Sequence, residues 1–358
     1  MNGAKEKIQI IIVEDDNKQQ EMYKDCIEEF NIDNPNYEIE AFQLANDQDV
    51  PKLIYNNHID AIIVDLDWGT GLQQNEGNRL VKKIYKDCRV PIFIVSGNLQ
   101  LLDEAYTESP ILKKYQRDDV DFNILLKEIE ELYITGYTKV MGNQSKIDEM
   151  LSKVFWKHMS NVIEHWKEQE PDVQAQRMLR FASTRLNEML TINIDNNHDD
   201  YDALEFYIKP AIKEVPFTGD IISFDDKKYI VITAACDMEQ DNSDYVVLCQ
   251  IEFNLIEDLK VRIKTGSNTA EKELEKYINN NKARFHLLPP CKLFTGGLID
   301  FHVIRSVKKE DFREYSSVIA SVNPAFNKDI QSRFSHYYGR QGQPQLNKQN
   351  IIDWIKGN

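Results

Sequence analysis

The sequence has few cysteines, and they are widely scattered. There is no C-x-x-C pair and the total is odd, the five residues being Cys26, Cys88, Cys236, Cys249 and Cys291. A disulfide framework or a clustered zinc site requires cysteines at closer, paired spacing. We therefore expect neither, and this cysteine usage is typical of a reducing cytosol.

Long apolar runs are also missing. The run "IQIIIV" at residues 8–13 is too short for a signal peptide or a membrane span. No other run approaches the thickness of a bilayer. We expect a cytoplasmic protein that has no membrane partner.

Positive charge is scarce as well. The 358 residues carry a formal net charge of −16, and residues 1–140 hold 27 acidic against 15 basic side chains. This balance argues against broad, non-specific binding to nucleic acids or membrane surfaces. With 42% hydrophobic and 10% aromatic residues, the chain can bury the cores of two or three domains.

The first 137 residues alternate between short aliphatic runs and amphipathic segments. Strands are expected at residues 7–13, 37–42, 59–66, 91–95 and 110–115, and helices at 17–30, 49–57, 77–86, 98–106 and 121–134. This alternation predicts an α/β domain, a doubly wound parallel five-stranded sheet with right-handed crossovers. Ligands bind such sheets at the carboxyl ends of the strands.

The pattern changes after residue 137. Residues 138–195 continue from a linker-like stretch, "GYTKVMGN", into two apolar helical stripes, which predict a helical pair. Residues 196–358 mix strand-like runs with helical segments near 255–280 and 324–338. We expect this last part to be an α+β effector domain of unknown activity, which could include a small β-barrel.

Acidic and hydroxyl side chains follow several of the expected strands of the first domain. Glu14 and Asp15 follow the first strand, Asp65 the third, and Ser96 the fourth. Because these strand ends meet at one edge of a parallel sheet, we expect the four side chains to converge. The stretch "DAIIVDLDWGTG" adds Asp67 two residues beyond Asp65.

One family whose first motif resembles this stretch is the haloacid-dehalogenase-like phosphatases, in which a strand is followed by D-x-D-G-T. "VDLDWGTG" is close to that motif, and "PIFIVSG" resembles the second motif. The resemblance would make Asp65 the nucleophile and Asp67 the acid of a phosphatase. The downstream acidic ligands would be Asp118, Asp119 and Asp121, which follow Ser96 very closely and run into a helix.

The receiver domain of two-component response regulators resembles residues 1–137 more fully. "IQIIIVEDDN", "IDAIIVDL", "NEGNRLVKKI" and "PIFIVSGN" match that family's elements in order, over about 135 residues. The resemblance implies a flavodoxin-like fold and a phosphoacceptor at Asp65. It also implies Mg²⁺ held by Glu14, Asp15 and Asp65, and Ser96 turning toward the phosphoryl oxygens. The implied partner is a histidine kinase or a phosphotransfer protein, and the implied activity is self-phosphorylation rather than turnover.

Two features depart from the receiver pattern. The family's lysine at the end of the fifth strand has three candidates, Lys113, Lys114 and Arg117, with no proline after them. We favour Lys114, because an arginine is not a compact point charge. Asp67 also stands where the family places a neutral side chain. A pseudo-receiver, which binds proteins without taking phosphate, is the alternative.

The remaining chain gives fewer indications. The helical pair would relay a signal, through a homodimer, to the C-terminal domain, which loosely resembles uncharacterised bacterial modules suspected in anti-phage defence. Basic and aromatic residues alternate in "NPAFNKDIQSRFSHYYGRQGQP", as nucleic-acid contacts could. We favour the interpretation that these aromatic side chains belong to the core. The hypothesis is a bacterial response-regulator-like signalling protein, in a defence pathway.

Overall fold

The structure is a computed structural model. It describes residues 5–68, 76–160, 162–166, 171–191, 200–211, 213, 215–240, 242–342 and 344–357. The chain divides into two compact units, Met1–Asn197 and His198–Asn358. Within the described ranges, no helix combines the length and the apolar character that a membrane span needs.

The first unit is built on the predicted sheet. Its five parallel strands lie in the order β2-β1-β3-β4-β5. They are β1 (Glu6–Val13), β2 (Tyr37–Leu44), β3 (Ala61–Val64), β4 (Ile92–Ser96) and β5 (Leu112–Gln116). The prediction of a doubly wound parallel sheet is therefore confirmed. The strands are aliphatic along their length because both faces of the sheet are covered.

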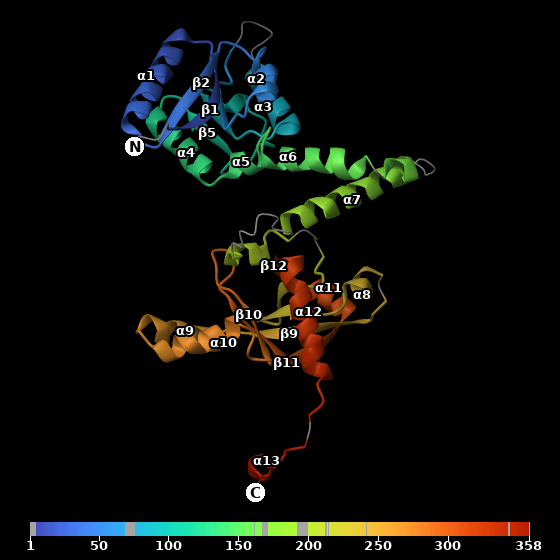
Figure 1. The fold of residues 1–358 in the computed structure, drawn as a ribbon. Coiled ribbons are helices and arrows are strands. Elements are labelled where there is room, and N and C mark those ends of the chain that lie inside the picture. Colours follow the sequence, from blue (N-terminus) through green and yellow to red (C-terminus); the bar gives the residue numbers. More distant parts are fainter. Residues whose placement is uncertain are drawn as a thin grey trace. The chain divides into compact units, whose positions relative to one another are not determined.

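Helices cover the two faces of this sheet (Figure 1). The helices are α1 (Asn17–Asp33), α2 (Val50–Asn56), α3 (Glu76–Asp87) and α4 (Phe122–Ile134). Alternate residues of β1 serve opposite cores. Ile10 packs with the apolar stripes of α1 and α4, whereas Ile11 packs with those of α2 and α3. Period-two alternation along a strand explains this division.

One predicted helix of this unit is wrong. Residues 98–106 form only a short 3₁₀ helix, η2 (Leu99–Leu101), before an irregular stretch that leads to β5. Leu102 and Tyr106 are both buried and so have the spacing of a helical face. An isolated segment of this length has little intrinsic helical stability, and its two apolar side chains reach the core from a loop instead.

The segment expected to be a linker is helical and continues into the helical pair. Its elements are α5 (Tyr137–Met141), α6 (Lys146–Lys153), the π-helical η3 (Val154–Met159), the 3₁₀ helix η4 (Ile163–Trp166) and α7 (Pro171–Thr191). Arg89, which follows α3, fixes the turn between α5 and α6. Its side chain donates to the carbonyl oxygen of Met141 at 2.8 Å and to the Asp148 carboxylate at 2.6 Å.

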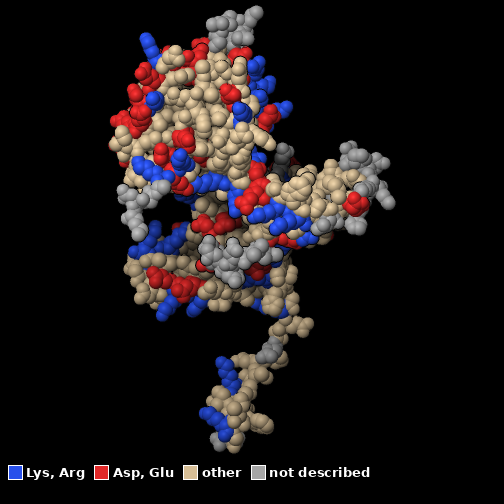
Figure 2. Space-filling model, turned by 45° about the horizontal axis from the view of Figure 1, so that its top comes forward, with Lys and Arg blue, Asp and Glu red and all other residues tan. Residues whose placement is uncertain are grey.

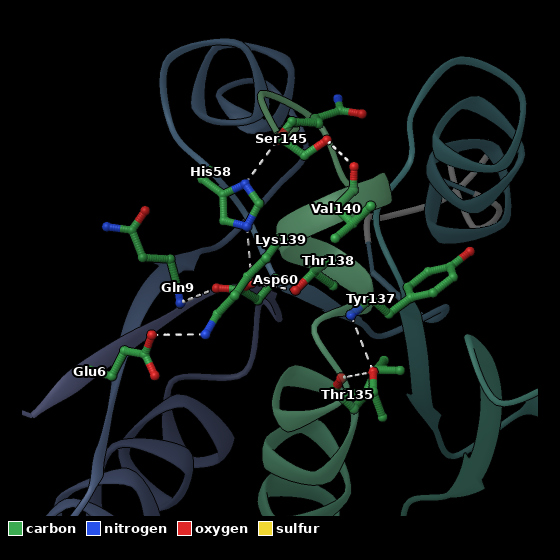
Figure 3. Close-up of polar contacts among 12 residues, drawn as sticks. Glu6, Gln9, His58, Asp60, Thr135, Tyr137, Thr138, Lys139, Val140 and Ser145 are labelled. Carbon is green, nitrogen blue, oxygen red and sulfur yellow. Dashed lines mark hydrogen bonds and ion pairs between the residues drawn. The ribbon is translucent and has the colours of Figure 1, made fainter. Parts of the chain in front are cut away.

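A buried carboxylate also holds α5 against the sheet. Asp60, just before β3, accepts hydrogen bonds from the Gln9 backbone N–H at 2.9 Å and from the Thr138 hydroxyl at 2.6 Å. His58 Nε2 lies 3.2 Å from the same carboxylate, while its Nδ1 lies 3.0 Å from the Asn143 carbonyl oxygen (Figure 3). Both ring nitrogens thus face acceptors, an arrangement that only the protonated imidazolium satisfies at both positions.

The second unit contains a seven-stranded antiparallel sheet, in the order β10-β11-β9-β8-β7-β12-β6. Its strands are β6 (Tyr207–Ile208), β7 (Asp220–Phe224), β8 (Lys227–Val231), β9 (Tyr245–Glu252), β10 (Phe285–Leu288), β11 (Gly297–Lys308) and β12 (Ser317–Val322). Among the residues described, the outermost strands β10 and β6 do not pair with each other. The sheet is open, so the small barrel considered from the sequence is not formed there.

Helices and a 3₁₀ turn complete this unit. They are η5 (Ala203–Phe206), α8 (Ala235–Glu239), α9 (Asn254–Lys264), α10 (Asn268–Ile278), α11 (Lys309–Tyr315), α12 (Pro324–Gly339) and α13 (Lys348–Lys356). The stretch near 255–280 is two helices rather than one. Gly266, at a φ of 83°, lies between them, and such a left-handed conformation ends a helix.

Helix α12 carries the mixed basic and aromatic segment. Phe326, Phe334 and Tyr337 pack against the core of the second unit, so these aromatic side chains are core residues. Arg333 also makes contacts within this unit. Its side chain donates to the Phe285 carbonyl oxygen at 2.9 Å and lies beside the carbonyl oxygens of Asn280 and Lys282.

Candidate functional site

The carboxyl ends of β1 and β3 bring two acidic residues together. Val13 and Val64 are paired in the sheet, and the residues that follow them are Glu14 and Asp65. The Asp65 N–H donates to the Val13 carbonyl oxygen at 3.0 Å. Both acidic residues are almost fully buried, at 1% and 2% exposure. The pairing register therefore fixes two carboxylates side by side at the sheet edge.

Asp15 completes an acidic cluster. Glu14, Asp15 and Asp65 each offer a carboxylate oxygen, and these three oxygens lie within 4.8 Å of one another. Asp15 is exposed, unlike the other two. The structure thus brings together the three residues that the sequence resemblance assigned to a metal ion. Three carboxylates on adjacent loops are the oxygen-rich environment that Mg²⁺ and Ca²⁺ prefer.

A single arginine neutralises part of this charge. Arg117 follows β5, and its Nη2 lies 2.6 Å from Asp65 Oδ2 and 3.0 Å from Glu14 Oε2. The guanidinium is largely buried, with 23% of the side chain exposed. Its backbone N–H donates to the Ser96 carbonyl oxygen at 3.0 Å, which extends the pairing of β5 with β4.

The site retains an excess of negative charge. Burial, and next the nearby Asp65 carboxylate, raise the pKa of Glu14 to about 7, while Arg117 acts in the opposite direction. Despite the close guanidinium, neither Asp65 oxygen accepts a well-aligned hydrogen bond from the described residues. Buried carboxylate oxygens without donors are costly. The carboxylate oxygens of this site and their negative charge therefore fit a hard divalent cation.

Ser96 and Gly77 border the same edge. Ser96 ends β4 and is completely buried, and its Oγ accepts a hydrogen bond from the Asn98 N–H at 3.2 Å. Gly77, in the first turn of α3, lies directly on the backbone of Asp65. A Cβ at Gly77 would be 2.4 Å from the Asp65 carbonyl oxygen. Gly77, which lies in the "NEGNRLVKKI" stretch of the receiver resemblance, thus permits α3 to approach Asp65 closely.

The structure places Arg117, and not the favoured Lys114, at the acidic cluster. The Lys114 ammonium donates to the Tyr106 carbonyl oxygen, and Lys113 pairs with Glu128 of α4. The preference for Lys114 depended on its compact point charge, whereas the group that reaches the cluster is a guanidinium, on the residue after Gln116, where β5 ends. Arg117 is then the first residue after its strand, as Glu14 and Asp65 are after theirs.

The phosphatase pattern is not reproduced in the described part of the chain. Asp67 is exposed and is not a member of the acidic cluster, while the neighbouring Trp68 is buried. Asp118 and Asp119 are also exposed and lie outside the cluster. Residues 69–75, which include the Gly-Thr of that motif and most of the long loop, lie outside the described residues.

The chain matches no known family model and no curated protein. Among solved structures, a CheY-like response regulator receiver domain protein from Methanospirillum hungatei JF-1 is similar over 36% of this chain and 98% of its own, at 18% identity and a TM-score of 0.25. A Burkholderia pseudomallei response regulator with a phosphorylated aspartic acid and a calcium ion covers 50% of this chain and 97% of its own, at 14% identity and a TM-score of 0.24. MazE-MazF from Deinococcus radiodurans matches 36% of this chain and 99% of its own, at 11% identity and a TM-score of 0.24.

Proposed function

We propose that the first unit is a phosphoryl acceptor of the receiver type, with Asp65 as the acceptor. A divalent cation, Mg²⁺ in the cell, would be held by Glu14, Asp15 and Asp65. The observation that carries this proposal is the acidic cluster at the ends of β1 and β3, in which Glu14 and Asp65 are buried and one arginine contacts both of them.

The chemistry needs little more than position and charge. An oxygen of the Asp65 carboxylate forms a bond to phosphorus while the donor's P–N or P–O bond breaks. The leaving histidine nitrogen or acetate oxygen keeps the electron pair of that bond. A bound divalent cation would supply positive charge against the phosphoryl oxygens. Arg117 and Ser96 would provide donors to the same oxygens.

Phosphorylation in this scheme changes the contacts of Arg117. The guanidinium now contacts Asp65 and Glu14 directly, and a phosphoryl group on Asp65 would draw it into new charge-assisted hydrogen bonds. A histidine kinase or phosphotransfer protein would be the donor. The helical segment from α5 to α7 would carry the change to the second unit as effector. The resemblance of residues 196–358 to modules suspected in bacterial defence stays a prediction.

Intact mass spectrometry after incubation with acetyl phosphate and Mg²⁺ tests this proposal. The wild-type chain should gain the mass of one phosphoryl group, and hydroxylamine should remove it. Asp65→Asn should gain none. Asp67→Asn is the matched control, because Asp67 is two residues away but exposed and outside the cluster, and it should behave as wild type. An adduct that persists in Asp65→Asn would contradict the assignment.

One observation favours a second function, the pseudo-receiver. Arg117 already contacts both buried carboxylates, so it can act as a built-in counter-ion where the metal would bind. In that case the unit would serve as an interaction domain without phosphate. Isothermal titration with Mg²⁺ distinguishes the two functions. Binding that Glu14→Gln weakens supports the acceptor, whereas absence of both binding and adduct supports the pseudo-receiver.

A further inference from the structure

The helical pair after the first domain consists of residues 146–159, which form α6 and η3, and of α7. Helix α7 runs back along the first helix and packs against it (Figure 1). On the facing stripes of the two helices Val154 is buried, but Ile147, Met150, Met178 and Met189 are only half-buried. Two helices by themselves therefore leave part of each other's apolar surface uncovered.

Four exposed apolar residues of the pair have one position in common, because each directly follows a residue of the facing stripes. They are Leu151 after Met150, Phe155 after Val154, Leu179 after Met178, and Leu190 after Met189. Their exposures are 43%, 61%, 68% and 63%, in that order. One step along a helix is a rotation of roughly 100° about its axis. Since the two helices run in opposite directions, this rotation brings both sets to the same side of the pair.

Charged side chains occupy the opposite side. Those that directly precede residues of the facing stripes are Lys146, Glu149, Lys153, Arg177 and Glu188. Glu149 pairs with Lys146 at 3.0 Å and with Lys153 at 2.6 Å. In Figure 2, the part of the molecule that projects at the right carries uncharged surface beside charged side chains. The pair thus has a charged side, which suits water, and an apolar side, which indicates an interaction surface.

We propose that the apolar side of the helical pair binds the same side of a second copy of this chain, so that two pairs form a four-helix bundle. The width of the apolar stripes supports this arrangement. A helix with one helical neighbour needs only a narrow apolar seam, whereas a helix in a bundle has two neighbours and a wider apolar face. Each helix here carries the facing stripe and the exposed positions beside it. This dimer does not depend on phosphoryl acceptance by Asp65.

The distribution of charge favours a second copy over a nucleic acid. A phosphate-bearing partner requires lysine or arginine side chains where it binds. Lys153 and Arg177 lie on the charged side of the pair, away from Leu151 and Leu179. The apolar side instead matches another apolar side, and the same patch on two copies is what a two-fold symmetric dimer requires.

The dimensions of the apolar side also suit a dimer. Residues 146–159 span about 21 Å and the 21 residues of α7 about 31 Å, and two adjacent helices are about 20 Å wide. The side therefore measures about 500 Å² on each copy, even when it is treated as flat. Two copies would bury at least about 1,000 Å², which is the area that a specific interface needs.

Three variants of the full chain test this inference by sedimentation equilibrium over a range of concentrations. Leu151→Glu and Leu179→Glu each place a charge on the apolar side. Val173→Glu is the matched control, because Val173 is 45% exposed on the same helix but directly precedes the half-buried Gln174. Wild type and the control should dimerise alike, and the first two variants should dimerise at least about tenfold more weakly. Far-UV circular dichroism shows whether each variant keeps its helix content.

Photocrosslinking gives a second readout that needs no added charge. Benzoylphenylalanine replaces Phe155 in one sample and Val173 in another, and a mixture of isotopically light and heavy chains identifies cross-links between copies. The first sample should cross-link to residues 146–190 of the other copy, and the second should not. A monomeric wild type overturns the proposal. A dimer that neither glutamate variant weakens, or cross-links from Phe155 only to residues outside 146–190, would show that another surface is used and would equally overturn it.

Discussion

Arg117 Nη2 lies 2.6 Å from Asp65 Oδ2, although the strands that these residues follow are separated by β4. The long arginine side chain spans that strand and also reaches Glu14, which follows β1. A lysine is a single point charge, whereas a planar guanidinium can contact two carboxylates at once. Arg117 thus contacts the oxygens that the proposed divalent cation would also require, so a bound cation would compete with it for the site.

Removal of Arg117 should destabilise the first unit. Arg117→Ala leaves two buried carboxylates without their counter-ion, and loss of one partner of such an ion pair costs on the order of 3 kcal/mol. Asp65→Asn removes the like charge beside Glu14 and should cost much less. Urea unfolding, followed by the fluorescence of the buried Trp68, measures both changes. Equal losses for the two variants would contradict the shared-counter-ion account.

Glu14 should make stability depend on pH in the direction opposite to most carboxylates. Its pKa in the folded chain is about 7, above its ordinary 4.5, so the folded state binds the proton more tightly. The contribution of Glu14 to the free energy of unfolding is fully present below pH 4.5 and is lost as the pH rises through 7. In the presence of EDTA, the free energy of unfolding should fall by up to about 3 kcal/mol over that range. Glu14→Gln should remove this part of the pH profile, and an unchanged profile would contradict the raised pKa.

The His58–Asp60 pair should hold α5 more tightly when His58 is protonated. The hydrogen bond and charge of Asp60 raise the pKa of His58 above its ordinary value, although burial and Lys139 oppose the shift. The contribution of this pair to the free energy of unfolding is fully present below pH 6.5 and is lost as the pH rises through the raised pKa of His58. His58→Ala should therefore cost about 1 kcal/mol at pH 6 and less at pH 9.

Thr138→Val provides the contrast for that experiment, because its hydroxyl donates to Asp60 without titrating. It should lower the free energy of unfolding by about 1–3 kcal/mol at both pH values. Hydrogen exchange of the α5 amides would report the same release locally. A His58→Ala loss that is the same at pH 6 and pH 9 would show that His58 is not charged in the folded chain.

Gly77→Ala should disturb the backbone at Asp65. Its Cβ would be 2.4 Å from the Asp65 carbonyl oxygen and 2.5 Å from the Leu66 Cα, so the backbone at the site must shift. We expect a destabilisation of about 1–3 kcal/mol and weaker Mg²⁺ binding in calorimetry. Gly97→Ala is the matched control, because a Cβ at Gly97 meets no atom within 4 Å. Equal effects of the two substitutions would contradict the close-approach explanation.

The sheet and its acidic edge could be predicted because both depend on local patterns. Aliphatic runs separated by amphipathic segments specify a parallel sheet, and its register then places Glu14 beside Asp65. The position of Arg117 could not be predicted, because the preference for a compact point charge favours Lys114, whereas the planar guanidinium contacts Glu14 and Asp65 at once. Because β5 ends at Gln116, Arg117 is the first residue after its strand, as Glu14 and Asp65 are after theirs, whereas Lys114 lies within β5.

Other features depended on contacts between distant residues. The "GYTKVMGN" stretch reads as a linker, yet the Asp60–Thr138 hydrogen bond and Arg89 stabilise a helix there. These interactions join residues whose proximity the sequence pattern does not reveal.

The most direct test of the central claim is to locate the phosphoryl group. After incubation with acetyl phosphate and Mg²⁺, borohydride reduction converts an aspartyl phosphate to homoserine, which peptide mass spectrometry assigns to one position. The account predicts homoserine at residue 65, dependent on Mg²⁺ and lost when Glu14 is replaced by Gln. Homoserine at another aspartate, or none under conditions in which Mg²⁺ binds, would contradict it.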